Sequence, residues 1–231
     1  MKTFLFDLDG TLLKMDVDTF TKVYIGSLAN YFKDKVEPEL MAKALWASVK
    51  AMVKNDGSKT NEMVFLDTFN ALTNQDFVSD DFINYYHEEF EKTIVSCTVD
   101  NEARELIDIL KAKGYRLVLA TNPIFPKIAT LTRMSFVGLK EEDFDYISTY
   151  ENAYFAKPNI NYYKEILNNI NETADNCIMV GNDADEDMIV KEALGIETYM
   201  ITNCLLNKSN KPIDADFVGT MQDLITYVKG L

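Results

Sequence analysis

Short apolar runs alternate with amphipathic segments along most of this chain. Each run ends at a polar, Gly-containing or Asp-containing corner. The clear runs and two weaker ones, given last, are Thr3–Phe6, Arg116–Ala120, Cys177–Val180, Thr198–Ile201, Tyr146–Ser148 and Phe217–Val218. Because these runs are apolar throughout instead of alternating with polar residues, they predict strands that are buried on both faces of a sheet.

Helical patterns separate several of these runs. Apolar stripes or helix-start signals predict helices over Asn101–Lys113, from Pro158 to about Asn169, and over Asp185–Leu194. Gly114 and Gly195 follow two of them, as is typical of a helix C-terminus. Strands that alternate with helices predict a parallel sheet with right-handed crossovers, that is, a doubly wound α/β fold.

Residues from about 14 to 95 break this alternation, because only amphipathic helices are predicted there. Their approximate bounds are Asp18–Phe32, Pro38–Lys54, Thr60–Leu72 and Asp80–Lys92. These helices either pack on the sheet or form a subdomain, and the length of the insertion favours a subdomain. We therefore expect an α/β core at 1–13 and 97–231, with a smaller all-helical domain at 14–96.

The composition disfavours several classes of function. The 231 residues carry 23 Lys plus Arg against 37 Asp plus Glu, a net charge of −14. Such a surface repels nucleic-acid backbones, so nucleic acid is not an expected partner. A single histidine, His87, disfavours His-dependent catalysis and multi-His metal sites, and it is expected on the surface. Three scattered cysteines predict neither a disulfide framework nor a zinc cluster.

The N-terminal apolar run is too short for a signal peptide, and no stretch approaches ~20 apolar residues. We therefore expect a cytoplasmic protein without a membrane partner. The sequence does not predict the oligomeric state.

Two carboxylates follow the first predicted strand directly, in the segment Phe6–Thr11. Asp7 and Asp9 point the same way if the chain is extended, and Gly10 lets it turn. Buried carboxylates at a strand end are costly unless a cation holds them, and Mg²⁺ prefers such oxygen ligands. A calcium loop starting at Asp7 is disfavoured, because Leu12 occupies the position that requires Gly.

A second acidic cluster, Gly181–Met188, follows another apolar run. It includes Asp183 and Asp187, which would share a face if a helix began there. The helix dipole favours acidic residues at such a place, but four acidic residues in seven positions exceed what capping needs. This cluster is interpreted as half of a metal site.

Two weaker features lie between these clusters. Thr121 and Asn122 end a predicted strand and can donate hydrogen bonds to phosphate oxygens, although Thr-Asn-Pro is also an ordinary turn. Lys157 precedes Pro158; a lysine before a helix is usually solvated, but this one precedes the second acidic cluster by one predicted helix and one predicted strand. Neither feature alone predicts a function.

Taken in order, these pieces resemble the haloacid dehalogenase-like hydrolase superfamily, which consists largely of phosphatases. The resemblance implies that Asp7 is the nucleophile that forms an aspartyl-phosphate, and that Asp9 is the general acid and base. It also implies that Thr121, Asn122 and Lys157 hold the transferring phosphoryl group. The helical insertion lies where many members of the superfamily carry a cap domain.

The resemblance further implies a Mg²⁺ cofactor. Its expected ligands are Asp7, Asp9 through the backbone carbonyl, and members of the second acidic cluster, Asn182, Asp183 and Asp187. Many members have Asp directly after the glycine of that cluster, whereas this chain has Asn182. We expect Asp183 to take the ligand role, with Asn182 as an alternative neutral ligand.

The expected activity is Mg²⁺-dependent hydrolysis of a small phosphomonoester. Two alternatives stay open, a phosphomutase on the same scaffold and a catalytically inactive phosphate or metal binder. The sequence does not identify the ester. Four aromatic residues of the insertion could face the site but at helical spacing are expected in its core, namely Tyr24, Phe32, Trp46 and Phe65.

Overall fold

The computed structural model describes residues 2–231 and contains a six-stranded sheet in the order β5-β4-β1-β6-β7-β8. Every neighbouring pair of strands in this sheet is parallel. The strands are β1 (Thr3–Phe6), β4 (Arg116–Leu119), β5 (Tyr146–Ile147), β6 (Cys177–Gly181), β7 (Glu197–Ile201) and β8 (Phe217–Gly219). All six apolar runs therefore form strands, and the predicted parallel sheet is confirmed.

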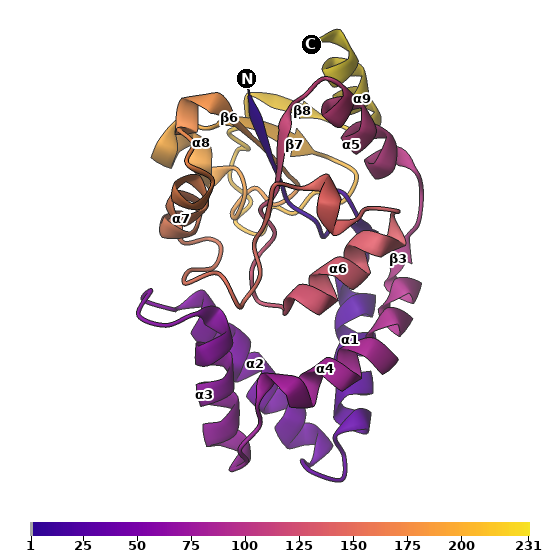
Figure 1. Cartoon of the computed structure of the whole chain (residues 1–231), viewed down its shortest axis with the longest axis vertical. Coiled ribbons are helices and arrows are strands. Elements are labelled where there is room, and N and C mark those ends of the chain that lie inside the picture. The colour runs from indigo at the N-terminus through magenta and orange to yellow at the C-terminus, as the bar shows by residue number, and fades with distance from the viewer. Residues whose placement is uncertain (1) are drawn as a thin grey trace.

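Helices cover both faces of the sheet (Figure 1). One apolar cluster joins the sheet to α5 (Glu102–Ala112), α6 (Lys127–Phe136) and α9 (Met221–Gly230), and the other joins it to α7 (Ile160–Ile170) and α8 (Ile189–Leu194). Successive residues of a strand point to opposite faces, so Phe4 and Phe6 enter the first cluster and Leu5 enters the second. The doubly wound α/β class is confirmed.

Two predicted helix starts are wrong. α7 begins at Ile160 instead of Pro158, because the side chain of Asn159 accepts a hydrogen bond from the Asn161 N–H and caps the helix there. α8 begins at Ile189 instead of Asp185, because turns occupy the acidic segment before it. The sequence analysis did not predict α6 and α9.

The inserted segment is helical, as predicted. It consists of α1 (Val17–Tyr31), α2 (Pro38–Val53), α3 (Asn61–Thr73) and α4 (Ser79–Glu88), followed by the 3₁₀ helix η1 (Phe90–Ser96). Figure 1 shows these four α-helices gathered at one end of the molecule, below the sheet and its helices, as a helical cap. The short 3₁₀ helices η2 (Glu141–Asp143) and η3 (Ala174–Asn176) belong to the core.

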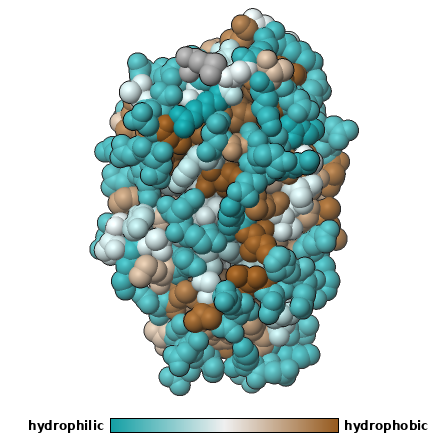
Figure 2. Space-filling view, viewed as in Figure 1, coloured by the Kyte–Doolittle hydropathy of each residue, from teal (hydrophilic) through white to brown (hydrophobic). Residues whose placement is uncertain are grey.

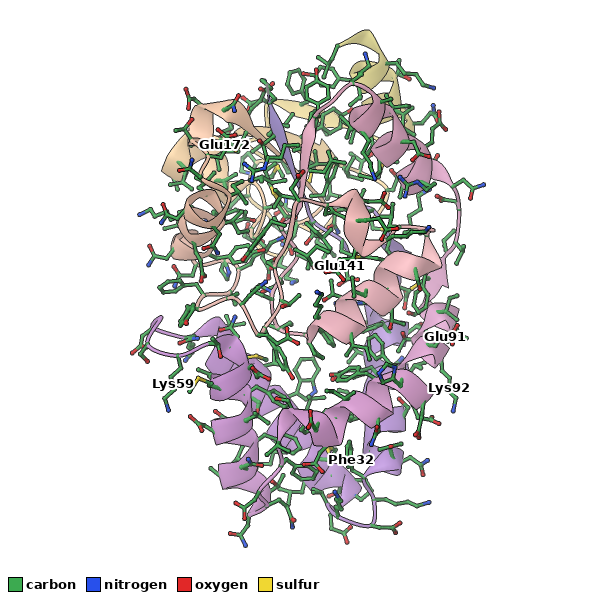
Figure 3. All side chains as sticks on the ribbon, viewed as in Figure 1. Phe32, Lys59, Glu91, Lys92, Glu141 and Glu172 are labelled. Carbon is green, nitrogen blue, oxygen red and sulfur yellow. The ribbon has the colours of Figure 1, made fainter. Side chains whose placement is uncertain are left out.

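Aromatic side chains fill the interior of the cap. Tyr24, Phe32 and Phe65 are buried, as expected, whereas Trp46 is 54% exposed. The ring centroids of Phe32 and Phe82 lie 5.4 Å apart, which is a normal contact distance for aromatic pairs. Figure 3 shows Phe32 among the cap helices. Three of the four aromatic residues considered above are therefore packed in the interior, and Trp46 is not.

Two short strands connect the cap to the rest of the chain. β2 (Lys14–Met15) pairs antiparallel with β3 (Cys97–Thr98). The Nζ of Lys14 lies 2.7 Å from Asp100 and 2.6 Å from Glu102, which ties the outgoing strand to the start of α5. The chain thus leaves the core and returns to it at one place.

The remaining expectations concern His87, the three cysteines and membrane-spanning helices. His87 is exposed, and all three cysteines are free thiols. Within residues 2–231, no helix has the length and apolar character needed to cross a bilayer.

Candidate active site

Asp7 directly follows β1 at the carboxyl edge of the sheet. Its backbone N–H donates to the carbonyl of Val180 at 3.0 Å, which continues the parallel pairing of β1 with β6. The side chain is largely buried, and its Oδ2 accepts a 3.3 Å hydrogen bond from the Thr11 hydroxyl. Gly10 allows the chain to turn here with φ +88°, and a Cβ on it would fall 2.2 Å from the amide nitrogen of Asn182. The loop therefore needs glycine for both conformation and space.

Lys157 reaches Asp7 from the loop before α7. Its Nζ lies 2.8 Å from Asp7 Oδ1 and 2.6 Å from Asp187 Oδ1, and all three side chains are buried. Burial raises the pKa of Asp7, although Lys157 opposes that rise. Burial by itself would lower the pKa of Lys157, but Asp187 and Asp7 outweigh it and hold that pKa well above its usual value. A lysine is thus the cation that makes this pair of buried carboxylates tolerable.

Asp187 holds both Lys157 and its own loop. Its Oδ2 accepts the backbone N–H groups of Asn182 at 3.1 Å and Asp183 at 3.0 Å. Burial raises the pKa of Asp187 to about 6 against the opposing influence of Lys157. A Cβ on Gly181 would fall 2.2 Å from Asp187 Oδ2, so glycine is required where this carboxylate crosses the strand end. Since both oxygens accept hydrogen bonds, Asp187 positions the loop, and its role as a metal ligand stays a prediction.

Asn182 and Asp183 lie next to this cluster. The amide oxygen of Asn182 accepts a 3.0 Å hydrogen bond from the same Thr11 hydroxyl that contacts Asp7. One oxygen of Asp183 accepts the N–H groups of Asp185 and Glu186, while the other lies 3.6 Å from the Nζ of Lys208. Asp183 and Asp187 do not share a helix face, because the segment forms turns instead of a helix.

Thr121 and Asn122 follow β4 at the same edge. The amide oxygen of Asn122 accepts the N–H of Lys157 at 3.3 Å, and its amide nitrogen donates to Glu186 at 3.1 Å. Tyr162 holds Thr121 in place by donating to its carbonyl oxygen at 2.7 Å. Asn122 therefore connects three segments that lie far apart in the sequence.

Asp9 is only partly buried, and its two oxygens differ. Its Oδ2 is paired with Arg133 on α6, whereas its Oδ1 is buried and has no hydrogen-bond partner among residues 2–231. The sequence analysis missed Arg133, because it did not predict α6. The sequence signal for its burial was an arginine inside a helical segment and next to apolar residues.

The oxygen donors of the site fit a hard divalent cation in their chemistry. Asp7, Asp183 and the amide of Asn182 supply anionic and neutral oxygens, and Asp9 Oδ1 is a buried acceptor without a donor. Within residues 2–231, no group of three or more His, Cys, Asp or Glu side chains is arranged to hold a metal ion. In this arrangement Lys157 supplies the positive charge.

A cavity and two surface grooves lie where the cap meets the core. A cavity of about 20 Å³ lies between cap residues such as Tyr24 and Phe65 and core residues such as Phe125 and Tyr150. A wider surface groove of about 530 Å³ contacts Gly10. Figure 2 shows apolar residues across the middle of one face, where a second groove, of about 840 Å³, runs between α4 and α6.

The structure thus combines a doubly wound parallel sheet, a buried carboxylate–lysine–carboxylate cluster at its carboxyl edge and an inserted helical cap. A family model described as haloacid dehalogenase-like hydrolase matches residues 1–195. The chain therefore belongs to the haloacid dehalogenase-like hydrolase family, as its resemblance predicted. By that match it is a hydrolase.

Several known proteins are similar over nearly the whole chain. A glyceraldehyde 3-phosphate phosphatase from Methanothermobacter thermautotrophicus is 26% identical, with 99% of this chain and 98% of that protein covered. A phosphatase structure from Thermococcus onnurineus has TM-score 0.64 and 17% identity, covering 100% and 99% of the two chains. A magnesium-bound structure of the hydrolase YfnB from Bacillus subtilis has TM-score 0.58 and 19% identity, covering 99% and 98%. The two structures support the fold.

Proposed function

We propose that this protein is a Mg²⁺-dependent phosphatase that hydrolyses a small phosphomonoester through an aspartyl-phosphate on Asp7. The observation that carries the proposal is the buried Asp7 carboxylate, held by Lys157 at the carboxyl edge of the sheet. The family match and the phosphatase relative support the reaction class. A covalent intermediate divides the difficult hydrolysis of a phosphate ester into two easier steps.

In the first step, an oxygen of Asp7 attacks phosphorus and the bond from phosphorus to the leaving oxygen breaks. Asp9 donates a proton to that leaving oxygen. In the second step, Asp9 takes a proton from water, the water oxygen bonds to phosphorus, and the carboxylate of Asp7 is released. General acid–base catalysis of this kind typically contributes about 10²–10⁴-fold.

Three further residues would hold the transferring group. Lys157 orients Asp7 and offers positive charge to the phosphoryl oxygens, while Thr121 and Asn122 donate hydrogen bonds to them. The contact between Asn122 and the backbone of Lys157 supports a shared role, since it fixes the distance between their segments.

Mg²⁺, when bound, would neutralise negative charge on the phosphoryl group. The residues proposed to hold it are Asp7, the backbone carbonyl of Asp9, Asn182, Asp183 and Asp187. The family and the magnesium-bound structural neighbour support this choice of ion.

The cavity between the cap and core residues such as Phe125 and Tyr150, of about 20 Å³, has room for little more than one water molecule and is lined by none of Asp7, Asp9 and Lys157. We therefore propose that residues 14–96 form a cap domain that moves to admit substrate and pivots near β2 and β3. The phosphatase relative acts on glyceraldehyde 3-phosphate, which makes short phosphorylated carbon chains the first esters to test.

The decisive experiment compares phosphate release by the wild type and the Asp7→Asn variant. Glyceraldehyde 3-phosphate and p-nitrophenyl phosphate serve as substrates, with and without Mg²⁺. We expect Asp7→Asn to lower turnover at least about 10³-fold, because the amide is a poor nucleophile. Asp175→Asn, an equal change of charge at an exposed position of η3, is the matched control and should behave as wild type.

Three results would contradict the proposal. The first is Mg²⁺-independent phosphate release that survives Asp7→Asn. The second is formation of a phosphate isomer without net phosphate release, which would indicate a mutase. The third is tight metal binding with no turnover of any phosphate ester, which would indicate an inactive binder.

A further inference from the structure

Arg133 is a buried arginine whose guanidinium group contacts a carboxylate, a backbone carbonyl and an aromatic ring. It lies on α6 with 1% of its side chain exposed, and one of its terminal nitrogens pairs with Asp9 Oδ2. Its Nε donates to the carbonyl of Ala129 at 3.2 Å, and its guanidinium carbon lies 4.4 Å from the ring centroid of Phe125. A buried guanidinium costs free energy unless such partners hold it, so its orientation is well determined.

The pairing leaves the carboxylate of Asp9 with two unlike oxygens. Oδ2 is anchored by Arg133, whereas Oδ1 is the buried side-chain polar atom that lacks a hydrogen-bond partner in the part of the chain that the structure describes. Leaving a buried acceptor unpaired costs about 1–3 kcal/mol, so such an atom is expected to meet a donor at some stage of the protein's work. The attacking water would be such a donor, and a protonated Oδ1 would in turn donate to the leaving oxygen.

Phe125 connects this pair to the cap. One contact of its ring is Arg133, and the same ring packs against the cap residues Phe20 and Tyr24 at centroid distances of 5.9 Å and 5.4 Å. Burial raises the pKa of Tyr24 to about 12, so this neighbour stays neutral. Figure 1 shows α6 running along the boundary between the cap helices and the sheet.

We infer that Arg133 is a positioning residue for the proposed general acid and base. It fixes the rotamer of Asp9 through Oδ2 so that Oδ1 faces the reacting atoms, with Phe125 and the closed cap holding the guanidinium in place. This inference rests on the proposed function, because it assumes that Asp9 transfers the proton. As a positioning residue, Arg133 contacts neither the phosphoryl group nor the rest of the substrate.

The test exploits the different proton needs of two leaving groups. An alkoxide must be protonated as it leaves, whereas p-nitrophenolate leaves without a proton. Arg133→Met should therefore lower kcat/KM about 10²-fold for glyceraldehyde 3-phosphate, the loss typical of a displaced catalytic group. For p-nitrophenyl phosphate the loss in kcat/KM should be about tenfold smaller, and KM should change little for either ester.

Two further variants separate positioning from structural damage. Arg133→Lys keeps the charge but loses the planar guanidinium, so it should recover only part of the lost activity. If Arg133→Met fails to fold, Arg133→Lys carries the same comparison of leaving groups. Lys127→Met removes a positive charge from the same helix, where Lys127 pairs with Glu141 near the surface, and should leave both kcat/KM values unchanged.

A double variant tests whether Arg133 acts through Asp9. If it does, adding Arg133→Met to Asp9→Asn should cause no further loss of kcat, because the group being positioned is already gone. Equal losses for both esters, an additive loss in the double variant, or a rise in KM would each overturn the inference. Those outcomes leave the proposed function intact, whereas activity that survives Asp7→Asn removes the proposed function itself.

Discussion

The carboxyl edge of the sheet and the interior of the cap are both buried, but they are built in opposite ways. At the sheet edge, Lys157 lies 2.8 Å and 2.6 Å from two buried carboxylates, and each contact depends on direction and charge. In the cap, rings such as Phe69 and Phe82 pack with centroids 5.5 Å apart, a contact between two uncharged side chains. Figure 3 shows the charged Lys59, Glu91 and Lys92 at the outer edge of the cap and Phe32 among its helices.

This contrast indicates which changes each region tolerates. Hydrophobic packing has no preferred direction, so a core accepts many substitutions that preserve volume. A buried charge without its partner is far less tolerable, because the remaining ion is left uncompensated in a medium of low dielectric constant. The sheet edge should therefore depend on individual residues, and the cap on its total packed volume.

The largest effect is expected at Lys157. Lys157→Met would remove the ammonium group that lies between the carboxylates of Asp7 and Asp187. We expect phosphate release to fall about 10³-fold and the free energy of unfolding to fall by about 3–5 kcal/mol, the usual cost of breaking a buried ion pair. Phosphate release and urea unfolding measure these effects. Lys140→Met, at a side chain that is 70% exposed, is the control. A Lys157→Met protein with wild-type stability would contradict our account of the site.

A variant in the interior of the cap should lose stability but keep its activity. Phe69 is fully buried, so Phe69→Ala should lower the free energy of unfolding by about 3–5 kcal/mol by creating a cavity. Phe69→Leu should cost clearly less. At temperatures where Phe69→Ala stays folded, hydrolysis of p-nitrophenyl phosphate should persist, because Phe69 lies away from the reacting groups. Thermal unfolding and phosphate release measure these two properties. A Phe69→Ala protein that loses activity but keeps its stability would contradict the proposed difference between the cap and the sheet edge.

The smallest effect is expected where the two regions meet. The buried amide of Asn61 donates to the carbonyls of Pro123 and Phe155, each at 3.1 Å, and accepts from Asn55 at 2.8 Å. Asn61→Ala should cost about 1–3 kcal/mol, because these groups lose their partner. Hydrogen exchange should rise at the junction, in residues 55–61 and 123–125. Asn84→Ala, on an exposed face of α4, serves as control, and unchanged exchange in Asn61→Ala would show that the junction does not depend on this amide.

The sequence predicted much of the fold because buried parallel strands are apolar throughout. The carboxyl ends of parallel strands lie at one edge of the sheet, so the sequence alone predicts that Asp7, Asn122 and Asp187 lie close together. The insertion was predicted because its periodicity changes from strand to helix. These features depend on residues that are close in the sequence.

The details that escaped prediction depend on contacts between distant segments. The sequence analysis assigned a divalent cation to the carboxylates, and the structure shows that Lys157 already bridges two of them. α8 starts late because Asp187 accepts backbone N–H groups of its own loop, which holds that loop in turns. Arg133 was missed because nothing near it in the sequence shows that its partner is Asp9, 124 positions away.

The pairing of β2 with β3 has a consequence for how such a chain can change over time. Since Lys14 lies opposite Thr98, the two ends of the intervening stretch are neighbours in space. Any segment whose own ends meet, whether a brief hairpin or a bundle of another size, could be spliced between them without disturbing the order of the sheet. The core and the cap can therefore diverge at different rates, because a change in the length or packing of residues 14–96 leaves the strand order of the sheet unaltered.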